Sequence, residues 1–158
     1  MNTLDILKTQ TRVGRERIAE LALKNGADAD RIPSGWNNNL RWHVGHLVIV
    51  PRRLTSMQFG EPLMMPEDYN KWFGRDSSPR SWGNDPVPLL EQLTAELISA
   101  MDAVFADMER RLLQPYPKPM VTVTGFTLKN PADALMMNVI HDGIHWGMML
   151  SMARALKQ

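Results

Sequence analysis

Apolar residues recur every three or four positions in four long stretches of this 158-residue chain, and that spacing is typical of one buried face of an α-helix. The first stretch predicts a helix over residues 3–24, because its pattern stops at the turn signal Asn25-Gly26. The others predict helices over about 37–58, from 86 or 88 to just before 115, and from 131 to about 157. The periodicity therefore favours an all-α chain.

Prolines mark where these helices begin or break. Pro131 follows Asn130, and an N-cap asparagine with proline at the first helical position is a strong helix start. Pro86 or Pro88 would begin the third helix in the same way. Pro51 lies inside the second stretch, where proline lacks the N–H and clashes with the preceding turn. We therefore expect a kink or break at Pro51.

Two segments between the helices lack the helical pattern. Residues 59–85 are rich in glycine and proline and include Trp72, Phe73 and Trp82, a composition typical of a long structured connection. These aromatic side chains either pin the connection onto the helices or line the mouth of a site, in which case the connection would act as a lid. Residues 120–128 are rich in β-branched side chains and predict a short extended segment or hairpin.

Four amphipathic helices with little strand signal predict a four-helix bundle, formed by a single domain that spans residues 1–158. The long connection permits a crossover, so the second and fourth helices can be neighbours without being consecutive. With 44% hydrophobic residues the chain has enough apolar side chains for a core. Functional sites in such bundles are commonly built from side chains that point inward.

Composition argues against several classes of function. A formal net charge of +1 gives no basic surface for nucleic acid, and the pairs Arg52-Arg53 and Arg110-Arg111 are interpreted as solvated helix ends. The absence of cysteine excludes disulfides, thiolate metal ligands and a thiol nucleophile of the protein's own. No basic and apolar leader opens the sequence, and no apolar run approaches about 18 residues. We therefore expect a soluble, cytoplasmic protein with no membrane partner.

The four histidines fall into two pairs, His43 with His46 and His141 with His145, each at helical spacing in an apolar stretch. Residues three or four apart lie on one helical face, about 5–6 Å apart, so two imidazoles can converge on one ion. In the fourth helix, His141 and His145 share a face with methionines that would point into the core. A divalent ion would satisfy several buried nitrogens at once, so the two pairs together predict a metal site.

Spacing alone does not choose between His43 and His46 as the third ligand. Three protein ligands would leave the metal an open position for water or substrate, which is the pattern of catalytic rather than structural zinc. Imidazole ligands suit zinc and nickel, which we expect first, and also iron(II).

The segment HDGIH at 141–145 has the spacing of the zincin motif H-E-x-x-H, with aspartate in place of the general-base glutamate. Asp142 lies about 100° around the helix from His141. It either supports a metal ligand from outside the coordination sphere, or is a solvated charge, or has no particular role. No histidine follows His145 to complete a zincin site, so a protease is disfavoured.

Two sequence blocks resemble the DinB-like (YfiT-like) family. The first is NNLRWHVGHL at 38–47, followed by FGEP at 59–62, and the second is HDGIHWG at 141–147, with Gly125 upstream. With the four-helix layout, the resemblance covers nearly the whole chain. It implies a four-helix bundle, often dimeric, that binds zinc, nickel or a similar divalent ion.

Carried over by position, the resemblance selects three metal ligands, namely His46, His141 and His145. It makes His43, Trp42 and Asp142 neighbours that support the ligands or line the pocket. The chain departs from the family pattern at Asp142, where glutamate is usual, and at Met148, where glutamine is frequent. Both departures concern the surroundings of the metal and not its ligands.

The function expected from these features is that of a metal-dependent enzyme with a small-molecule substrate. Some members of the family are thiol-dependent transferases, so the first expectation is transfer of a low-molecular-weight thiol. The alternatives are a metal-dependent hydrolase and a non-catalytic stress-response or binding module with a structural or vestigial metal. The resemblance also implies a homodimer.

Overall fold

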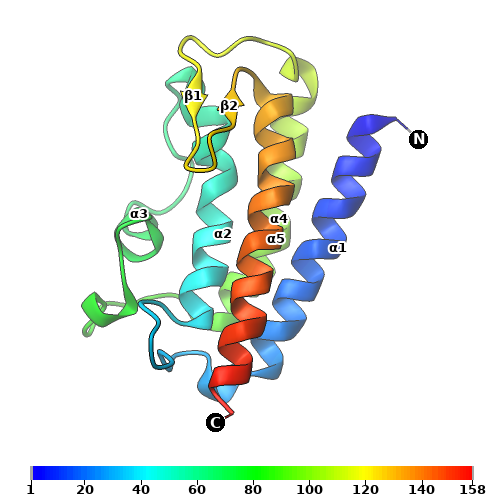
Figure 1. Ribbon diagram of the computed structural model, residues 1–158. Coiled ribbons are helices and arrows are strands. Elements are labelled where there is room, and N and C mark those ends of the chain that lie inside the picture. The colour runs from blue at the N-terminus through cyan, green and yellow to red at the C-terminus, as the bar shows by residue number, and fades with distance from the viewer. Residues whose placement is uncertain (1, 158) are drawn as a thin grey trace.

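The computed structural model describes residues 2–157 and consists of four long helices, one short helix and a small hairpin (Figure 1). The predicted all-α bundle with a short hairpin is confirmed. The hairpin pairs β1 (Met120–Val121) with β2 (Thr127–Leu128) in antiparallel register. The long helices are α1 (Thr3–Lys24), α2 (Leu40–Leu54), α4 (Leu90–Met108) and α5 (Pro131–Ala155).

Asparagine side chains cap the starts of three long helices. At α1, the Asp5 N–H donates to the Asn2 side chain at 2.9 Å, and the Asn2 N–H donates to the Asp5 carboxylate at 3.0 Å. Asn39 caps α2 by accepting a hydrogen bond from the Trp42 N–H at 2.8 Å, and Asn130 caps α5 in the same way. Each cap satisfies an N–H that the helix itself leaves unpaired, and α1 and α5 begin where the sequence predicts.

α2 ends at Leu54, earlier than predicted, although Pro51 is accommodated inside the helix. Because Pro51 brings no N–H, the last turn is weakened, and the Thr55 hydroxyl bonds back to the Pro51 carbonyl at 2.8 Å. The chain then tightens into a 3-10 helix, Ser56–Phe59. The break expected from the proline therefore falls about one turn after it.

α4 begins at Leu90, later than the proline positions predict. Proline disfavours the helical conformation of the residue before it, so Val87, which precedes Pro88, stays outside the helix. The cap comes instead from the Gln92 side chain, which accepts a hydrogen bond from the Leu89 N–H at 2.9 Å.

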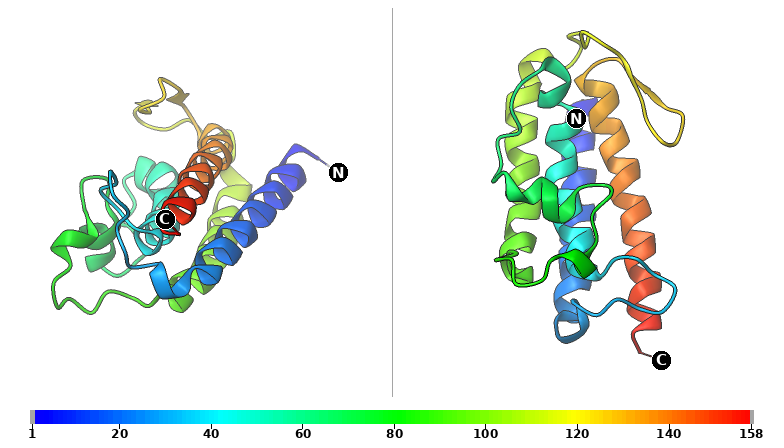
Figure 2. Two further views of the ribbon diagram at one scale, coloured as in Figure 1. Left: turned by 60° about the horizontal axis from the view of Figure 1, so that its bottom comes forward. Right: turned by 90° about the vertical axis from the view of Figure 1, so that its left-hand side faces the viewer.

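The four long helices form two parallel pairs. α1 and α5 run in one direction, and α2 and α4 run in the other (Figure 1, Figure 2). Around the bundle the order is α1, α5, α2, α4, so α2 and α5 are antiparallel neighbours, as the crossover permits. No helix within residues 2–157 is long and apolar enough to cross a membrane.

The connection between α2 and α4 is pinned to the bundle by aromatic side chains. It contains the short helix α3 (Asp68–Phe73), which packs on α2. Trp72, Phe73 and Trp82 are all buried in the main core. The Trp72 indole donates to the Asp85 carboxylate at 2.8 Å, and the Trp82 indole donates to the Trp72 carbonyl at 3.2 Å. Burial of three large aromatic rings holds this connection in place.

One buried arginine joins all four long helices. Arg15 of α1 donates to the Asp142 carboxylate of α5 at 2.9 and 3.2 Å. It also donates to the Leu47 carbonyl of α2 at 2.9 Å and to the Leu97 carbonyl of α4 at 2.6 Å. A buried charge is stable only when it is paired and hydrogen-bonded. These contacts therefore constrain how α5 is rotated against the other helices.

Candidate metal centre

The structure brings three histidines of α2 and α5 into one cluster. His46, His141 and His145 each offer a ring nitrogen, and these nitrogens all lie within 4.8 Å of one another. The ring centroids of His141 and His145 are 4.4 Å apart, and that of His46 lies 5.3 and 5.0 Å from theirs. The cluster forms because His141 and His145 share one face of α5 and the antiparallel α2 places His46 opposite them.

His46 is oriented by the connection between α2 and α4. Its Nδ1 lies 2.8 Å from the Phe73 carbonyl oxygen. A carbonyl only accepts hydrogen bonds, so Nδ1 carries the proton and Nε2 keeps its lone pair for a ligand. Gly45 makes this approach possible, because a Cβ at that position would overlap the Phe73 ring. The glycine and α3 together therefore set both the orientation and the tautomer of His46.

His145 is oriented by His43, whose Nδ1 lies 2.7 Å from the Nδ1 of His145. One of these nitrogens carries the shared proton. When His145 is the donor, its Nε2 is free to bind a metal, and His43 acts as the supporting acceptor. His43 is not part of the three-residue cluster. The structure therefore places it beside the cluster, in contact with one of its members.

Trp42 covers one side of the cluster. Its ring stacks on that of His46, with centroids 4.7 Å apart and an interplanar angle of 14°, and meets His43 edge-on at 5.2 Å. The Trp42 indole N–H donates to the Ser77 hydroxyl at 2.8 Å, which ties the indole to the connection. Trp42 thus lines the pocket and restricts the motion of two imidazoles.

Asp142 points away from the histidines into the bundle core. It is 4% exposed, so the alternative of a solvated charge is wrong. Burial raises the pKa of the Asp142 carboxyl, and the Arg15 guanidinium opposes that rise. With both oxygens bound by Arg15, this carboxylate does not occupy the position of a zincin general base.

Burial keeps the histidines neutral. Loss of hydration lowers the pKa of His43, His46 and His141 to about 4, and that of His145 to about 2. Neutral imidazole is the form that binds metals. Within residues 2–157, the Nδ1 of His141, a member of the cluster, is buried without a hydrogen-bond partner, which is unusual for a buried nitrogen. The donor set is therefore compatible with a divalent metal.

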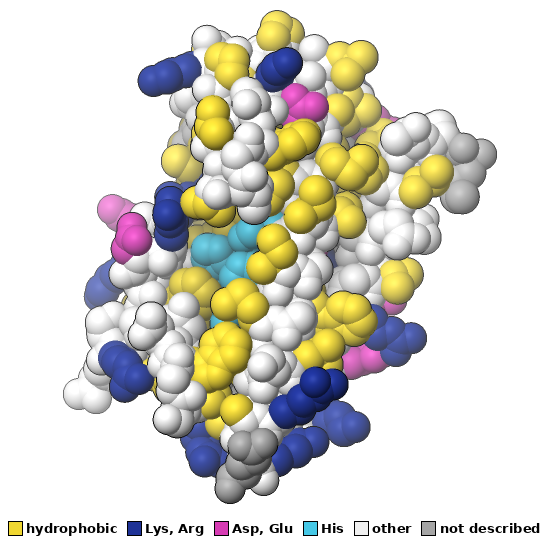
Figure 3. Space-filling view, viewed as in Figure 1, with side chains coloured by type: hydrophobic (Ala, Val, Ile, Leu, Met, Phe, Trp, Pro, Cys, Tyr) yellow, Lys and Arg dark blue, Asp and Glu magenta, His cyan; other side chains and the backbone are white. Residues whose placement is uncertain are grey.

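A pocket of about 570 Å³ opens onto the cluster. Figure 3 shows the histidine side chains at the bottom of a hollow that is edged mainly by hydrophobic side chains. The apolar walls come from four segments, with α2 supplying Val50 and Leu54, the 3-10 helix after it supplying Met57, α5 supplying Met137 and Met148, and the hairpin region supplying Met120, Val121 and Val123.

Parts of this wall are not predicted by the sequence. Arg53 lies in the last turn of α2, as expected of a helix end, but it is also partly buried and lines the pocket, which is not among the expectations from the sequence. Its spacing of seven residues from His46, two turns along one face, is a signal that would have found it. Of the described residues 59–85, only Arg75 reaches the pocket. The aromatic side chains of the connection do not line its mouth, so that alternative is wrong.

The sequence predicts the hairpin near 120–128 but not its place beside the histidines, since no local pattern shows where a connection folds back. The homodimer stays a prediction, because nothing in the geometry of one chain tests it.

A family model described as the DinB superfamily matches residues 9–149, which is most of the chain. Comparison with curated proteins gives no match.

Proposed function

Because the chain belongs to the DinB superfamily, we propose that it is a metal-dependent enzyme that transfers a low-molecular-weight thiol to an electrophilic substrate. His46, His141 and His145 would hold the metal. The observation that carries this proposal is a three-imidazole cluster at the bottom of an open pocket. Three protein ligands leave a coordination position for a small molecule, as in catalytic sites.

Zinc and nickel are the proposed metals, and iron(II) suits the same ligands. A bound divalent ion supplies the charge that deprotonates a coordinated thiol near neutral pH. The protein's own part is to orient the ligands through the hydrogen bonds of His46 to Phe73 and of His145 to His43. Such outer hydrogen bonds fix ring orientation and tautomer.

The proposed transfer exchanges one bond of the electrophile for a bond to sulfur. The thiol loses its S–H proton to solvent, and its sulfur forms a bond to the electrophilic carbon. The leaving group departs with the electron pair of the bond that breaks. The apolar walls of the pocket would limit the water that competes with sulfur for the electrophile.

The pocket favours this reaction over the two alternatives. No Asp or Glu lines it among the described residues, and Asp142 is held by Arg15. Hydrolases with histidine ligands commonly pair the metal-bound water with a carboxylate base, as the glutamate of H-E-x-x-H does, and the described lining of this pocket offers no carboxylate for that role. A structural ion would have a closed set of protein ligands, which the open pocket does not favour.

Metal analysis tests the site. After reconstitution with zinc or nickel, the wild-type protein is expected to retain about one equivalent of metal, and His46→Ala is expected to lose it. Bound metal should also raise the melting temperature, because an ion that binds only the folded state stabilises it. Retention below about a tenth of an equivalent in the wild type would remove the basis of the proposal.

Thiol consumption tests the reaction. Metal-loaded protein is mixed with a panel of low-molecular-weight thiols and chlorodinitrobenzene, and the loss of free thiol is followed. Faster loss with wild type than with His46→Ala supports the transferase. Equal rates with both proteins, in samples shown to contain metal only in the wild type, would contradict it.

A further inference from the structure

Two arginines line the histidine pocket, and neither has an acidic partner in the described part of the chain. Arg53 comes from the last turn of α2, and Arg75 follows α3 in the connection. Within residues 2–157, neither side chain forms an ion pair with a carboxylate. The pocket wall therefore carries positive charge that no carboxylate of the described residues neutralises.

Arg53 lies on the same face of α2 as His46, the member of the histidine cluster that this helix carries. It follows His46 by seven residues, so it lies about 10 Å further along the helix axis, with Val50 between them. After burial, the positive charge of Arg53 is among the causes that lower the pKa of His46. A ligand that reaches from the cluster toward Arg53 would pass along an apolar wall.

Arg75 is brought near the histidine cluster by the backbone segment that contacts His46. It is two residues beyond Phe73, whose carbonyl holds His46. Arg75 is exposed, so its side chain is free to change conformation and bind a ligand at the mouth of the pocket. The two arginines thus approach the same space from α2 and from the connection.

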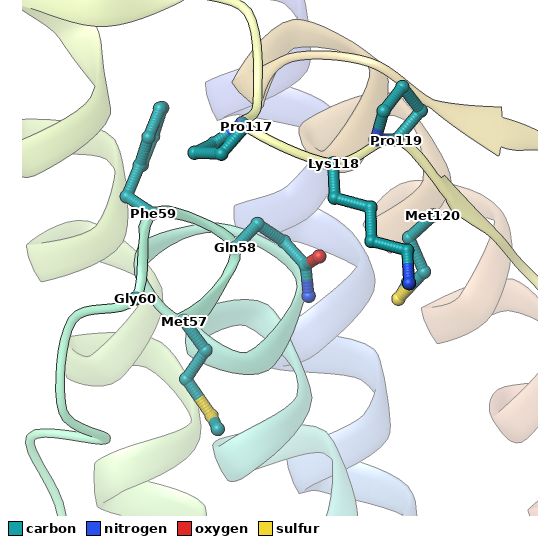
Figure 4. A pocket seen from close by; sticks show the side chains of 8 residues that line it. All are labelled: Met57, Gln58, Phe59, Gly60, Pro117, Lys118, Pro119 and Met120. Carbon is teal, nitrogen blue, oxygen red and sulfur yellow. The ribbon is translucent and has the colours of Figure 1, made fainter.

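A second hollow of about 560 Å³ adjoins the histidine pocket and shares Met57, Gln58 and Met120 with it. Figure 4 shows Met57 and Gln58 on the 3-10 helix after α2, and Lys118 extending from the facing segment beside Met120. Lys118 forms no ion pair among the described residues, and no Asp or Glu lines this hollow. The excess of unpaired positive charge therefore continues into it.

We propose that the pocket binds a small organic anion with an apolar body, whose carboxylate or phosphate group is held by Arg53 and Arg75. This inference rests on the proposed function in one respect: the anion would be either the thiol or the electrophile that accepts it. Guanidinium is well suited to both head groups, because it presents paired N–H donors in a fixed plane. Apolar walls select the body of the ligand, and the arginines select its charge.

Three probes of equal chain length test this inference, namely mercaptohexanoate, mercaptohexanol and mercaptohexyl phosphate. Their affinities are measured by calorimetry on zinc-loaded and on metal-free protein. Wild type is expected to bind an anionic probe at least about tenfold more tightly than the alcohol in both forms, because hydrogen bonds to charged groups are strong. The carboxylate and phosphate arms show which head group the arginines prefer.

Arg52→Gln is the matched control for Arg53→Gln, because it removes the same charge from the neighbouring residue, which lines a different hollow. Arg53→Gln should lose most of the preference for the anion, Arg75→Gln part of it, and Arg52→Gln almost none. Arg53→Lys should retain much of the preference, and thermal melting shows whether each variant is folded.

Two results would overturn the inference. One is wild-type protein that binds the alcohol as tightly as the anions, or binds none of the probes. The other is an equal loss of preference in Arg52→Gln and Arg53→Gln, which would mean that only net charge matters. Failure of the proposed function alone would give another result. Zinc would then not raise the affinity for any thiol probe, while the protein would still bind the anionic probes more tightly than the alcohol.

Discussion

Arg15 and Asp142 form an ion pair in which both side chains are almost completely buried, at 1% and 5% exposure. Asp142 directly follows His141 in the sequence, yet the two side chains point to different sides of α5, about 100° apart. The ion pair faces the bundle core, and the imidazole faces the pocket. The buried pair therefore constrains the rotation of α5 and, through it, the position of two proposed metal ligands.

Breaking this pair should destabilise the protein strongly. Arg15→Met leaves the Asp142 carboxylate buried without a partner, which is expected to cost about 3–5 kcal/mol of unfolding free energy. The double variant Arg15→Met with Asp142→Leu should cost less than Arg15→Met alone, because no buried charge remains. Urea denaturation of the wild type, the single variant and the double variant measures their unfolding free energies.

The matched control is the exposed pair of Arg12 and Asp102, whose side chains are 52% and 55% exposed at a distance of 2.7 Å. Asp102→Ala should change stability by no more than about 1 kcal/mol. Similar losses in Arg15→Met and Asp102→Ala would show that the buried pair contributes nothing special.

The two histidines of α2 should differ in their effect on metal binding. His46→Leu removes a proposed ligand and should abolish stoichiometric binding. His43→Leu removes only the acceptor for His145, so it should keep the stoichiometry and weaken affinity by about 10–100-fold. Competition with a chelator measures both. Complete loss of metal in His43→Leu would instead make His43 a ligand.

Gly45 should not tolerate a side chain. Gly45→Ala would push the Phe73 ring away from α2, so we expect a loss of about 1–3 kcal/mol in stability from overpacking, with weaker metal binding as the Phe73 carbonyl moves from His46. Gly143→Ala is the control, since a Cβ there meets open space and alanine favours a helix by up to about 1 kcal/mol over glycine. If Gly45→Ala were as stable as Gly143→Ala, α3 would not be positioned by close packing.

Metal-free protein should lose stability as the pH falls from about 6.5 toward 4. In the unfolded chain the histidines take up protons near their ordinary pKa, whereas burial lowers the folded pKa of His43, His46 and His141 to about 4. The unfolded state then binds more protons, so unfolding free energy falls by up to about 1.4 kcal/mol per pH unit for each histidine. This stability is fully present above pH 6.5 or so.

Urea midpoints of metal-free protein between neutral and acidic pH measure the effect. His141→Leu should flatten the pH dependence by about one proton, since one buried imidazole is gone. A midpoint that stays constant across this range in the wild type would contradict burial of neutral histidines.

Local sequence signals predicted the bundle and the starts of α1 and α5, because the relevant physics is local. The caps at Asn2, Asn39 and Asn130 act within one turn, and apolar spacing marks the buried face of each helix. The errors lie where local rules compete. Pro51 is tolerated in α2, and the cap of α4 comes from Gln92 and not from a proline.

The surroundings of the candidate site were harder to predict because they depend on distant contacts. The spacing of His141 and His145 showed that they share a face, but no pattern near Asp142 names Arg15, which is 127 residues away. Likewise, the Phe73 carbonyl reaches His46 only after the connection has folded onto α2. The metal-ligand role of the three histidines itself stays a prediction.

The hairpin that faces the histidines is a separate structural unit from the helices α2 and α5 that carry them. It is a short surface hairpin, with Met120 paired to Leu128 and Val121 to Thr127, whereas the histidines belong to two long packed helices. Mutations in residues 120–123 can therefore reshape the space above the cluster with little effect on the bundle. The hairpin is therefore the segment in which the shape of the pocket can be varied while the helices that carry the histidines stay unchanged.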